Sequence, residues 1–138
     1  MNTAPVLYDR RRLLARRRRA YAAACGRTSV DKAPDFLLHW AVDDMIGRLK
    51  MVQRDFPRAA EDMGHTGILA KTLRDASKNR RVTRVEACQT FLNDTPGVDA
   101  KVGDEEHLPI PLASQDLIVA PLCLHTANEV TGALIQMR

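Results

Sequence analysis

Cysteine pairs are missing from this sequence, although it has three cysteines among its 138 residues. Cys25, Cys88 and Cys123 lie far apart and form no CxxC motif. Isolated cysteines argue against a disulfide framework or a zinc site, and they indicate a reducing compartment, with the cytoplasm as the expected location. We therefore predict no metal site and three buried or half-buried thiols.

Long apolar runs are also missing. No stretch approaches the ~20 residues that a membrane-spanning helix needs, and no apolar core of a secretory signal follows the basic N-terminus. Hydrophobic residues make up 45% and charged residues 28% of the chain, which is typical of globular proteins. The sequence therefore predicts one globular domain with one core and no membrane span.

The net charge of +4 is distributed unevenly along the chain. Residues 1–27 carry eight arginines and one aspartate, a charge of +7, whereas residues 28–138 carry 13 basic and 16 acidic residues, a charge of −3. A nucleic-acid-binding domain usually has a basic face on its folded body. Because the positive charge is confined to an N-terminal arm, the sequence argues against nucleic acid as a partner.

The arginine-rich arm is predicted to form a helix over residues 9–24, because Arg and Ala favour helices and Asp9 can cap the first turn. A basic helix can bind RNA, an acidic partner or a membrane surface, and mitochondrial presequences share its composition. It can equally pack on the domain through Leu13, Leu14 and Tyr21. We favour packing, since a dedicated nucleic-acid binder usually places aromatic side chains among its arginines.

A second helix is predicted to begin at residue 35 and to end before Phe56 and Pro57. Six apolar residues recur in it at helical spacing. They are Phe36, Leu37, Trp40, Ala41, Ile46 and Leu49. This pattern is typical of an amphipathic helix that covers a sheet, and we interpret its Trp40 and His39 as structural residues rather than ligands.

Beyond Pro57 the pattern alternates between short strands and helices. Strands are predicted at residues 58–63, 81–86, 98–102 and 116–122. Helices are predicted at residues 67–77, 87–93 and 128–137. Such alternation predicts an α/β fold, in which a parallel sheet carries helices on both faces.

Glycines and acids stand where three of these strands end. The stretch AEDMGHTGIL, residues 60–69, places Gly64 and Gly67 after the first strand. Glu86 ends the second strand, and Asp104 follows the third. Ligands of open parallel sheets bind outside the carboxyl ends of the strands, where glycines let backbone amides approach and an acid takes the ribose hydroxyls. The pattern indicates a site for a nucleotide-like cofactor.

The order of glycine loop, acid and VGDEEHLP resembles class I S-adenosylmethionine-dependent methyltransferases. Three stretches, LYDRRRLLARRRRAYAA, DFLLHWAVDDMIGRL and VGDEEHLPIPLASQDLIVAPLCLHTANEVTGALIQMR, are similar to one subgroup over nearly the whole chain. That subgroup includes bacterial methyltransferases of the biotin-synthesis type and the mitochondrial complex I assembly factor of methyltransferase fold. The resemblance implies a Rossmann-like methyltransferase fold, S-adenosylmethionine as cofactor, and the mitochondrial matrix as location in a eukaryote.

The resemblance also implies how the chain is organised. Residues 1–34 form a basic N-terminal helical arm, and residues 35–138 form the cofactor-binding half of a methyltransferase domain with strand order 3-2-1-4. Family members continue past ALIQMR, so the C-terminal strands are missing. The fourth strand, with its apolar residues 117–122, then becomes an exposed edge, and we predict self-association through it.

Six residues receive a cofactor-binding role from the resemblance. The methionine moiety is lined by Glu61, Gly64 and Gly67, the ribose hydroxyls are held by Glu86, and the adenine lies beside Asp104 and Glu105. No side chain is identified as a catalytic residue. Near the mouth of the site, His125 is interpreted as a surface residue, and Asp116 as the start of a strand.

The glycine loop departs from the family pattern of an acid followed by three alternate glycines. Aligned on Gly67, the loop has Glu61 as its acid, but Met63 and His65 replace the first two glycines. Aligned instead on Asp62 and Gly64, the loop is one residue short. A non-glycine residue with positive φ is uncommon, so we predict weakened rather than abolished cofactor binding.

The function implied by the resemblance is methyl transfer from S-adenosylmethionine to an unidentified small-molecule or protein acceptor, reduced or lost in so short a chain. The alternative is a non-catalytic assembly or interaction protein, of the complex I assembly-factor type, that kept the methyltransferase fold. A fold alone does not decide between them. Cofactor binding without methyl transfer would favour the alternative.

Overall fold

The computed structural model describes three stretches of the chain. They are residues 5–25, 35–92 and 96–138. The predicted border between arm and domain, after residue 34, lies outside these stretches, and so does the side chain of Cys25. The other two cysteines, Cys88 and Cys123, are buried as predicted.

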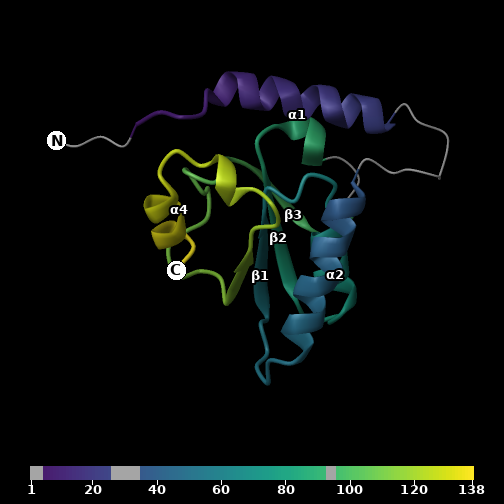
Figure 1. Cartoon of the computed structure of the whole chain (residues 1–138). Coiled ribbons are helices and arrows are strands. Elements are labelled where there is room, and N and C mark those ends of the chain that lie inside the picture. The colour runs from purple at the N-terminus through teal and green to yellow at the C-terminus, as the bar shows by residue number, and fades with distance from the viewer. Residues whose placement is uncertain (1–4, 26–34, 93–95) are drawn as a thin grey trace.

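Four parallel strands form a sheet in the order β3-β2-β1-β4 (Figure 1). The strands are β1 (Arg58–Asp62), β2 (Arg81–Glu86), β3 (Asp99–Val102) and β4 (Leu117–Val119). This arrangement confirms the predicted α/β fold and its strand order of 3-2-1-4. Within the described chain β4 pairs with β1 alone, so it forms one edge of the sheet, and self-association through that edge stays a prediction.

Helices connect the strands and cover the sheet (Figure 1). They are α1 (Arg10–Cys25), α2 (Phe36–Lys50), α3 (Ile68–Asp75), the 3₁₀ turns η2 (Gln89–Leu92) and η3 (Leu124–Thr126), and α4 (Val130–Gln136). Of the helix predicted over residues 87–93, the described part up to residue 92 forms only the turn η2.

The fourth strand is shorter than the sequence predicts, because it ends at Val119 instead of residue 122. Pro121 cannot donate a backbone hydrogen bond to a neighbouring strand. Leu122 then adopts a φ of 57°, which is incompatible with extended backbone. The apolar run therefore leaves the sheet after three residues and turns toward η3.

The helix α2 faces the core with a stripe that matches the predicted one in part, because Ala41 is buried and Ile46 and Leu49 pack against the core. Its buried residues are Leu38, Ala41 and Val42, whereas Phe36 and Trp40 are exposed, Trp40 by 67%. Two neighbouring stripes of this helix carry apolar residues at helical spacing, so the periodicity did not distinguish them. The predicted place of Trp40 on the covering face was wrong.

The hydrophobic core lies between the sheet and the helices α2 and α3. Leu38 and Val42 of α2 meet Leu69 and Leu73 of α3 over the small side chain of Ala59 in β1. Small residues in the central strand let the two helices approach the sheet closely. This packing fixes the loop between β1 and α3 at the carboxyl end of the sheet.

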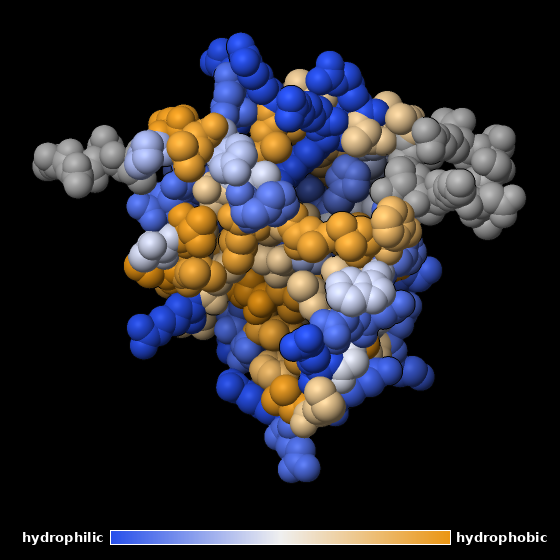
Figure 2. All heavy atoms as spheres, in the orientation of Figure 1, coloured by the Kyte–Doolittle hydropathy of each residue, from blue (hydrophilic) through white to orange (hydrophobic). Residues whose placement is uncertain are grey.

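The arginine-rich helix α1 crosses that same end of the sheet (Figure 1). Its residues Leu13, Leu14 and Tyr21 are half-buried, which confirms the packing interpretation. The arginines that point away make this edge of the molecule strongly hydrophilic (Figure 2). Within the described residues, no helix combines the length and the apolar character that a membrane crossing requires.

Candidate functional site

The loop between β1 and α3 has the shape of a glycine loop although two glycines are replaced. Met63 has a φ of 55°, His65 a φ of 62° and Gly67 a φ of 75°. All three values lie in the left-handed region that favours glycine. Each non-glycine residue held there costs about 1–3 kcal/mol. The sequence predicted this conflict, and the structure retains the loop conformation in spite of it.

Backbone and ring contacts hold the loop in this conformation. The His65 amide donates a hydrogen bond to Glu86 Oε1 at 2.5 Å, and the Met63 amide donates to the Val85 carbonyl at 2.9 Å. The imidazole of His65 lies 5.4 Å from the Phe91 ring, centroid to centroid. Both replacement residues are therefore fixed by contacts to β2 and to the segment that follows it.

A buried network of charges lies beneath the loop. Arg84 Nε lies 3.1 Å from Glu61 Oε2, and Arg84 Nη2 lies 3.2 Å from Glu86 Oε1. All three residues are at most 1% exposed. A Cβ on Gly64 would come within 1.8 Å of Glu61 Oε1, so the Glu61 carboxylate lies directly against the loop backbone. Gly64 is therefore required by its contact with Glu61.

Burial dominates the protonation of both acids in this network. Desolvation raises the pKa of Glu61 to about 7, although the charge of Arg84 opposes the shift. Desolvation also raises the pKa of Glu86, against the opposing effects of Arg84 and the His65 amide. A single guanidinium thus serves two buried carboxyl groups, and the network holds a proton more readily than exposed carboxylates do.

Asp62 is a further buried acid at this end of the sheet, and it is not one of the six predicted site residues. Neighbouring residues of a strand point to opposite faces, so Asp62 lies on the face opposite Glu61. Its side chain is fully buried, and neither carboxylate oxygen has a hydrogen-bond partner among the described residues. Desolvation, together with the charges of Glu105 and Glu86, raises the pKa of Asp62 to about 7. In the sequence, the only signal for Asp62 was the alternative alignment of the loop, which takes Asp62 instead of Glu61 as the acid before the glycines.

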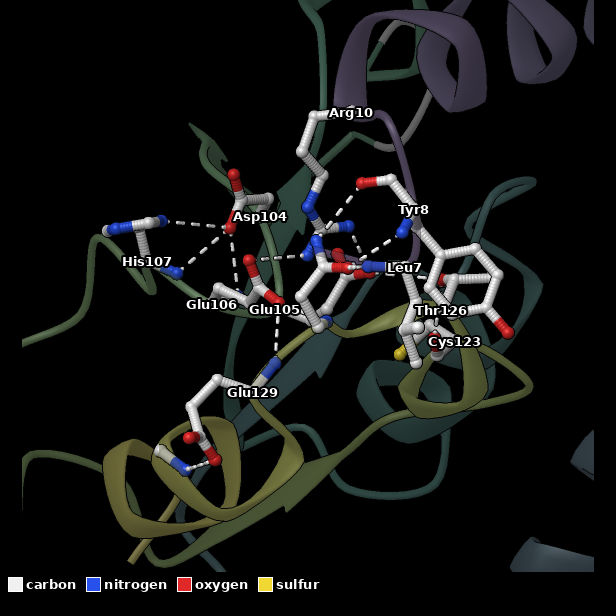
Figure 3. A network of polar contacts seen from close by, with 12 residues as sticks. Leu7, Tyr8, Arg10, Asp104, Glu105, Glu106, His107, Cys123, Thr126 and Glu129 are labelled. Atoms are coloured by element: carbon white, nitrogen blue, oxygen red, sulfur yellow. Dashed lines mark hydrogen bonds and ion pairs between the residues drawn. The ribbon is translucent and has the colours of Figure 1, made fainter. Parts of the chain in front are cut away.

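The turn after β3 presents acids to the same region (Figure 3). Asp104 Oδ1 accepts hydrogen bonds from the amides of Glu106 and His107 at 2.8 and 2.9 Å, which closes the turn. Glu105 is fully buried and its Oε1 accepts from the Thr126 hydroxyl at 3.1 Å, whereas its Oε2 has no partner within the described chain. A buried carboxylate with a vacant oxygen can accept a donor from a ligand.

Two arginines of α1 supply the counter-charges for this turn. Arg10 contacts Glu105 at 2.7 Å and Glu106 at 3.1 Å (Figure 3). Arg17, two turns further along the helix, lies 4.0 Å from Glu105. Ahead of the helix, the amide of Tyr8 donates to the side chain of Asn128 at 2.7 Å. The basic arm therefore covers the acidic end of the sheet.

A small cavity lies between α1 and the strand ends. It is lined by Arg10, Leu13, Leu14 and Arg17 of α1 and by Met63, Ala87, Gly103, Asp104 and Glu105 beneath them. Its volume of about 100 Å³ is below the roughly 300 Å³ that small-molecule sites usually have. The cavity is therefore smaller than a nucleotide-sized ligand requires.

The structure brings the six predicted site residues to one end of the sheet, at different depths. Asp104 and Glu105 line the cavity. Glu61 and Glu86 lie in the buried network below it, and Gly64 and Gly67 lie in the loop between. Their binding of a cofactor stays a prediction. His125 is exposed in η3 and is not among the residues that line the cavity. Asp116 forms a bidentate contact with Arg58 where β4 begins.

Comparisons with known proteins identify the fold. No family model and no curated protein matches the sequence. Solved methyltransferase structures do match. A putative methyltransferase of Haloferax volcanii, in complex with a methyltransferase activator, gives a TM-score of 0.65 at 16% identity and covers 93% of this chain.

Two further structures agree. The S-adenosylmethionine-bound amino pentose methyltransferase of calicheamicin biosynthesis from Micromonospora echinaspora gives a TM-score of 0.60 at 16% identity over 99% of this chain. A possible histamine N-methyltransferase from Thermotoga maritima gives 0.58 at 20% identity over 75%. The chain thus has the Rossmann-like methyltransferase fold.

The present chain spans about half the length of the structures that it matches. It covers 53% of the first, 53% of the second and 48% of the third. At these identities the likeness establishes the fold alone. The subgroup suggested by the sequence motifs is not among the proteins compared above.

Proposed function

We propose that this chain is the cofactor-binding part of an S-adenosylmethionine-dependent methyltransferase whose acceptor is still to be identified. One observation carries the proposal. The loops that follow β1, β2 and β3 contribute Met63, Ala87 and Asp104 to one cavity at the carboxyl end of a methyltransferase-type sheet. Ligands of open α/β sheets bind at this position.

The charges of the site fit a cofactor that carries positive groups. Asp62 is fully buried, and neither of its carboxylate oxygens has a hydrogen-bond partner within the described residues. Glu105 is paired with Arg10 through Oε1, and its Oε2 has no such partner there. Buried carboxylates of this kind are costly unless a donor or a cation reaches them. The ammonium and sulfonium groups of S-adenosylmethionine would supply such positive charge.

Each part of the site has a separate task in this proposal. Asp104 accepts from the exocyclic amine of the adenine, and Glu86 binds the ribose hydroxyls. Gly64 and Gly67 allow the loop backbone to approach the methionine moiety. The bound cofactor supplies an electrophilic methyl group, so the protein has to orient the acceptor and exclude water. The helix α1 excludes water when it covers the cavity.

The acceptor and the partners belong to the proposal as well. The sequence motifs support a subgroup that resembles biotin-synthesis-type methyltransferases and the complex I assembly factor. Either a small molecule or a protein side chain can serve as methyl acceptor. Because one structural relative was solved with an activator protein, we include a protein partner among the candidates.

Calorimetric titration of the chain with S-adenosylmethionine tests the proposal. We expect binding by the unaltered chain and a loss of about tenfold or more in affinity for Asp104→Ala, which removes a polar contact of the ligand. Asp44→Ala is the matched control, because Asp44 is an exposed acid of α2 that pairs with Arg48. Equal weakening by both variants would contradict the placement of the site.

Absence of binding by the unaltered chain would reject the proposal for this 138-residue chain. Binding without methyl transfer to amine, carboxylate and protein acceptors would favour the non-catalytic assembly alternative instead. The two results are distinguishable, because the titration measures the cofactor alone and the transfer assay adds the acceptor.

A further inference from the structure

Arg84 connects three separate pieces of the candidate site from beneath. Its Nε lies 3.1 Å from the Glu61 carboxylate at the end of β1. Its Nη2 lies 3.2 Å from Glu86 Oε1 and donates to the His65 carbonyl at 2.8 Å. The planar guanidinium presents its donors in a fixed fork. One side chain thus contacts the end of β1, the end of β2 and the loop between β1 and α3.

The contact with His65 is made at a strained point of the chain. His65 and Met63 both hold positive φ values, and such conformations persist only where surrounding contacts over-determine them. The His65 carbonyl accepts from Arg84, and the His65 amide donates to Glu86. Both backbone groups of His65 are therefore bound to the same buried ion pair.

The register of the strands explains why Arg84 reaches Glu61 and Glu86. Glu61 lies directly opposite Arg84 in the parallel pairing of β1 and β2, so their side chains emerge on the same face of the sheet. Glu86 follows two residues later on the same strand and shares that face. Arg84 is 1% exposed, and a buried guanidinium at this place needs the carboxylate of Glu61 to be tolerated.

We propose that Arg84 is a positioning residue that holds the loop of residues 63–67 and the Glu86 carboxylate in the geometry that receives the cofactor. Glycine adopts positive φ values freely, but this loop has Met63 and His65 at two such positions. Arg84 instead holds the loop in that conformation through its charge and its hydrogen bonds. Glu61 serves as the counter-charge that keeps the guanidinium in place. The effect on cofactor binding rests on the proposed function, whereas the effect on the loop does not.

Two variants of the full chain test this role. The double substitution Glu61→Met with Arg84→Met removes both members of the ion pair and leaves apolar side chains of similar size, which buried sites often tolerate. Arg84→Lys keeps the positive charge beside Glu61 but loses the fork that reaches Glu86 and His65. Circular dichroism and a cooperative thermal transition establish that each variant is folded.

Amide hydrogen exchange of the ligand-free chain is the first measurement. We expect the amides of residues 63–67 to exchange at least about tenfold faster in both variants, while those of the core helix α3 keep their protection. A merely structural role for Arg84 would raise exchange in α3 and the loop together. Loop protection within about twofold of the unaltered chain in Arg84→Lys would overturn the proposal.

Titration with S-adenosylmethionine is the second measurement. We expect affinity to fall about tenfold in the folded variants, with Arg84→Lys affected less than the double variant. Unchanged affinity in both would overturn the positioning role. If the unaltered chain does not bind S-adenosylmethionine, the proposed function fails, and the hydrogen exchange alone then decides whether Arg84 holds the loop.

Discussion

The ring of Tyr21 meets the imidazole of His65 edge-on, with the ring centroids 5.9 Å apart and the planes at 86°. Phe91 lies against both rings, 5.1 Å from Tyr21 and 5.4 Å from His65. Tyr21 belongs to α1 and His65 to the strained loop. The covering helix and the loop therefore rest on a common aromatic cluster, and movement of α1 removes one support of the loop.

Removal of the Arg10 side chain should loosen α1. The substitution Arg10→Met removes the guanidinium that lies 2.7 Å from Glu105, and it leaves the Glu105 carboxylate buried without its nearest positive charge. Breaking a buried pair costs about 3–5 kcal/mol, and because the Arg10 side chain is 29% exposed we expect about 2 kcal/mol. Urea unfolding measures the loss, and proteolysis within α1 should become faster. Arg18→Met, at an exposed position of the same helix, is the control and should change neither quantity.

Stability should fall as the pH rises from 5 to 8. The native pKa values of Glu61 and Asp62 are about 7, and the unfolded values are near 4, so the native chain binds more protons in this window. Their stabilisation is complete below the unfolded pKa values and is lost as pH passes the native ones. We expect a fall of at least roughly 2 kcal/mol.

His65 acts in the opposite direction, because its lowered pKa reduces stability as the pH falls below 6.5. Asp62→Asn isolates the carboxyl contribution, since this variant should show a smaller fall between pH 5 and 8 than the unaltered chain. Urea unfolding at both pH values provides the comparison. A stability that rises with pH in the unaltered chain would contradict the assignment.

Cofactor affinity should rise with pH through the titration of Asp62. A cation binds to the ionised carboxylate, so binding at pH 6 must first displace a proton, and affinity should be up to about tenfold weaker there than at pH 8. Calorimetry in buffers of different ionisation enthalpy counts the released protons. Asp62→Asn should bind more weakly, with little dependence on pH. Proton-neutral binding by the unaltered chain would show that Asp62 does not meet the ligand charge.

Met63→Gly should strengthen cofactor binding. Met63 lines the cavity with a φ of 55°, and glycine relieves that strain and lets the backbone approach the ligand. A gain of about 1 kcal/mol corresponds to roughly fivefold in affinity. Titrations of the unaltered chain and of Met63→Gly with S-adenosylmethionine measure the difference. Equal affinities would show that the strain at Met63 does not weaken cofactor binding. His65→Gly is the contrasting variant, because it also removes the ring contacts to Tyr21 and Phe91.

The sequence predicted those parts of the site that depend on chain order. Glu86 and Asp104 stand at strand ends because a parallel sheet places all carboxyl ends together, and that rule needs no side-chain detail. The positive φ of Met63 was expected for a similar reason, since its position in the loop demands it. Periodicity and loop chemistry are local properties, which a single sequence displays directly.

Contacts between distant segments were beyond such reasoning. Arg10 and Glu105 are 95 residues apart, and only the path of α1 brings them together. The pairing of Glu61 with Arg84 depends on the register of two strands, which a shift of one residue would abolish. Neighbouring residues of a strand point to opposite faces. If the end of β1 had been known, the sequence would have placed Glu61 and Asp62 on opposite faces of the sheet.

The pairing of β1 with β4 has a consequence for the order of folding. Arg58 and Asp116 meet across 58 residues of chain, whereas Arg58 lies opposite Arg81 in β2, much nearer along the chain. Closing the longer loop costs about 0.8 kcal/mol more in chain entropy. We therefore expect the unit of β1, α3 and β2 to assemble before β4 joins, so that the loop of residues 63–67 takes its shape before that edge of the sheet exists.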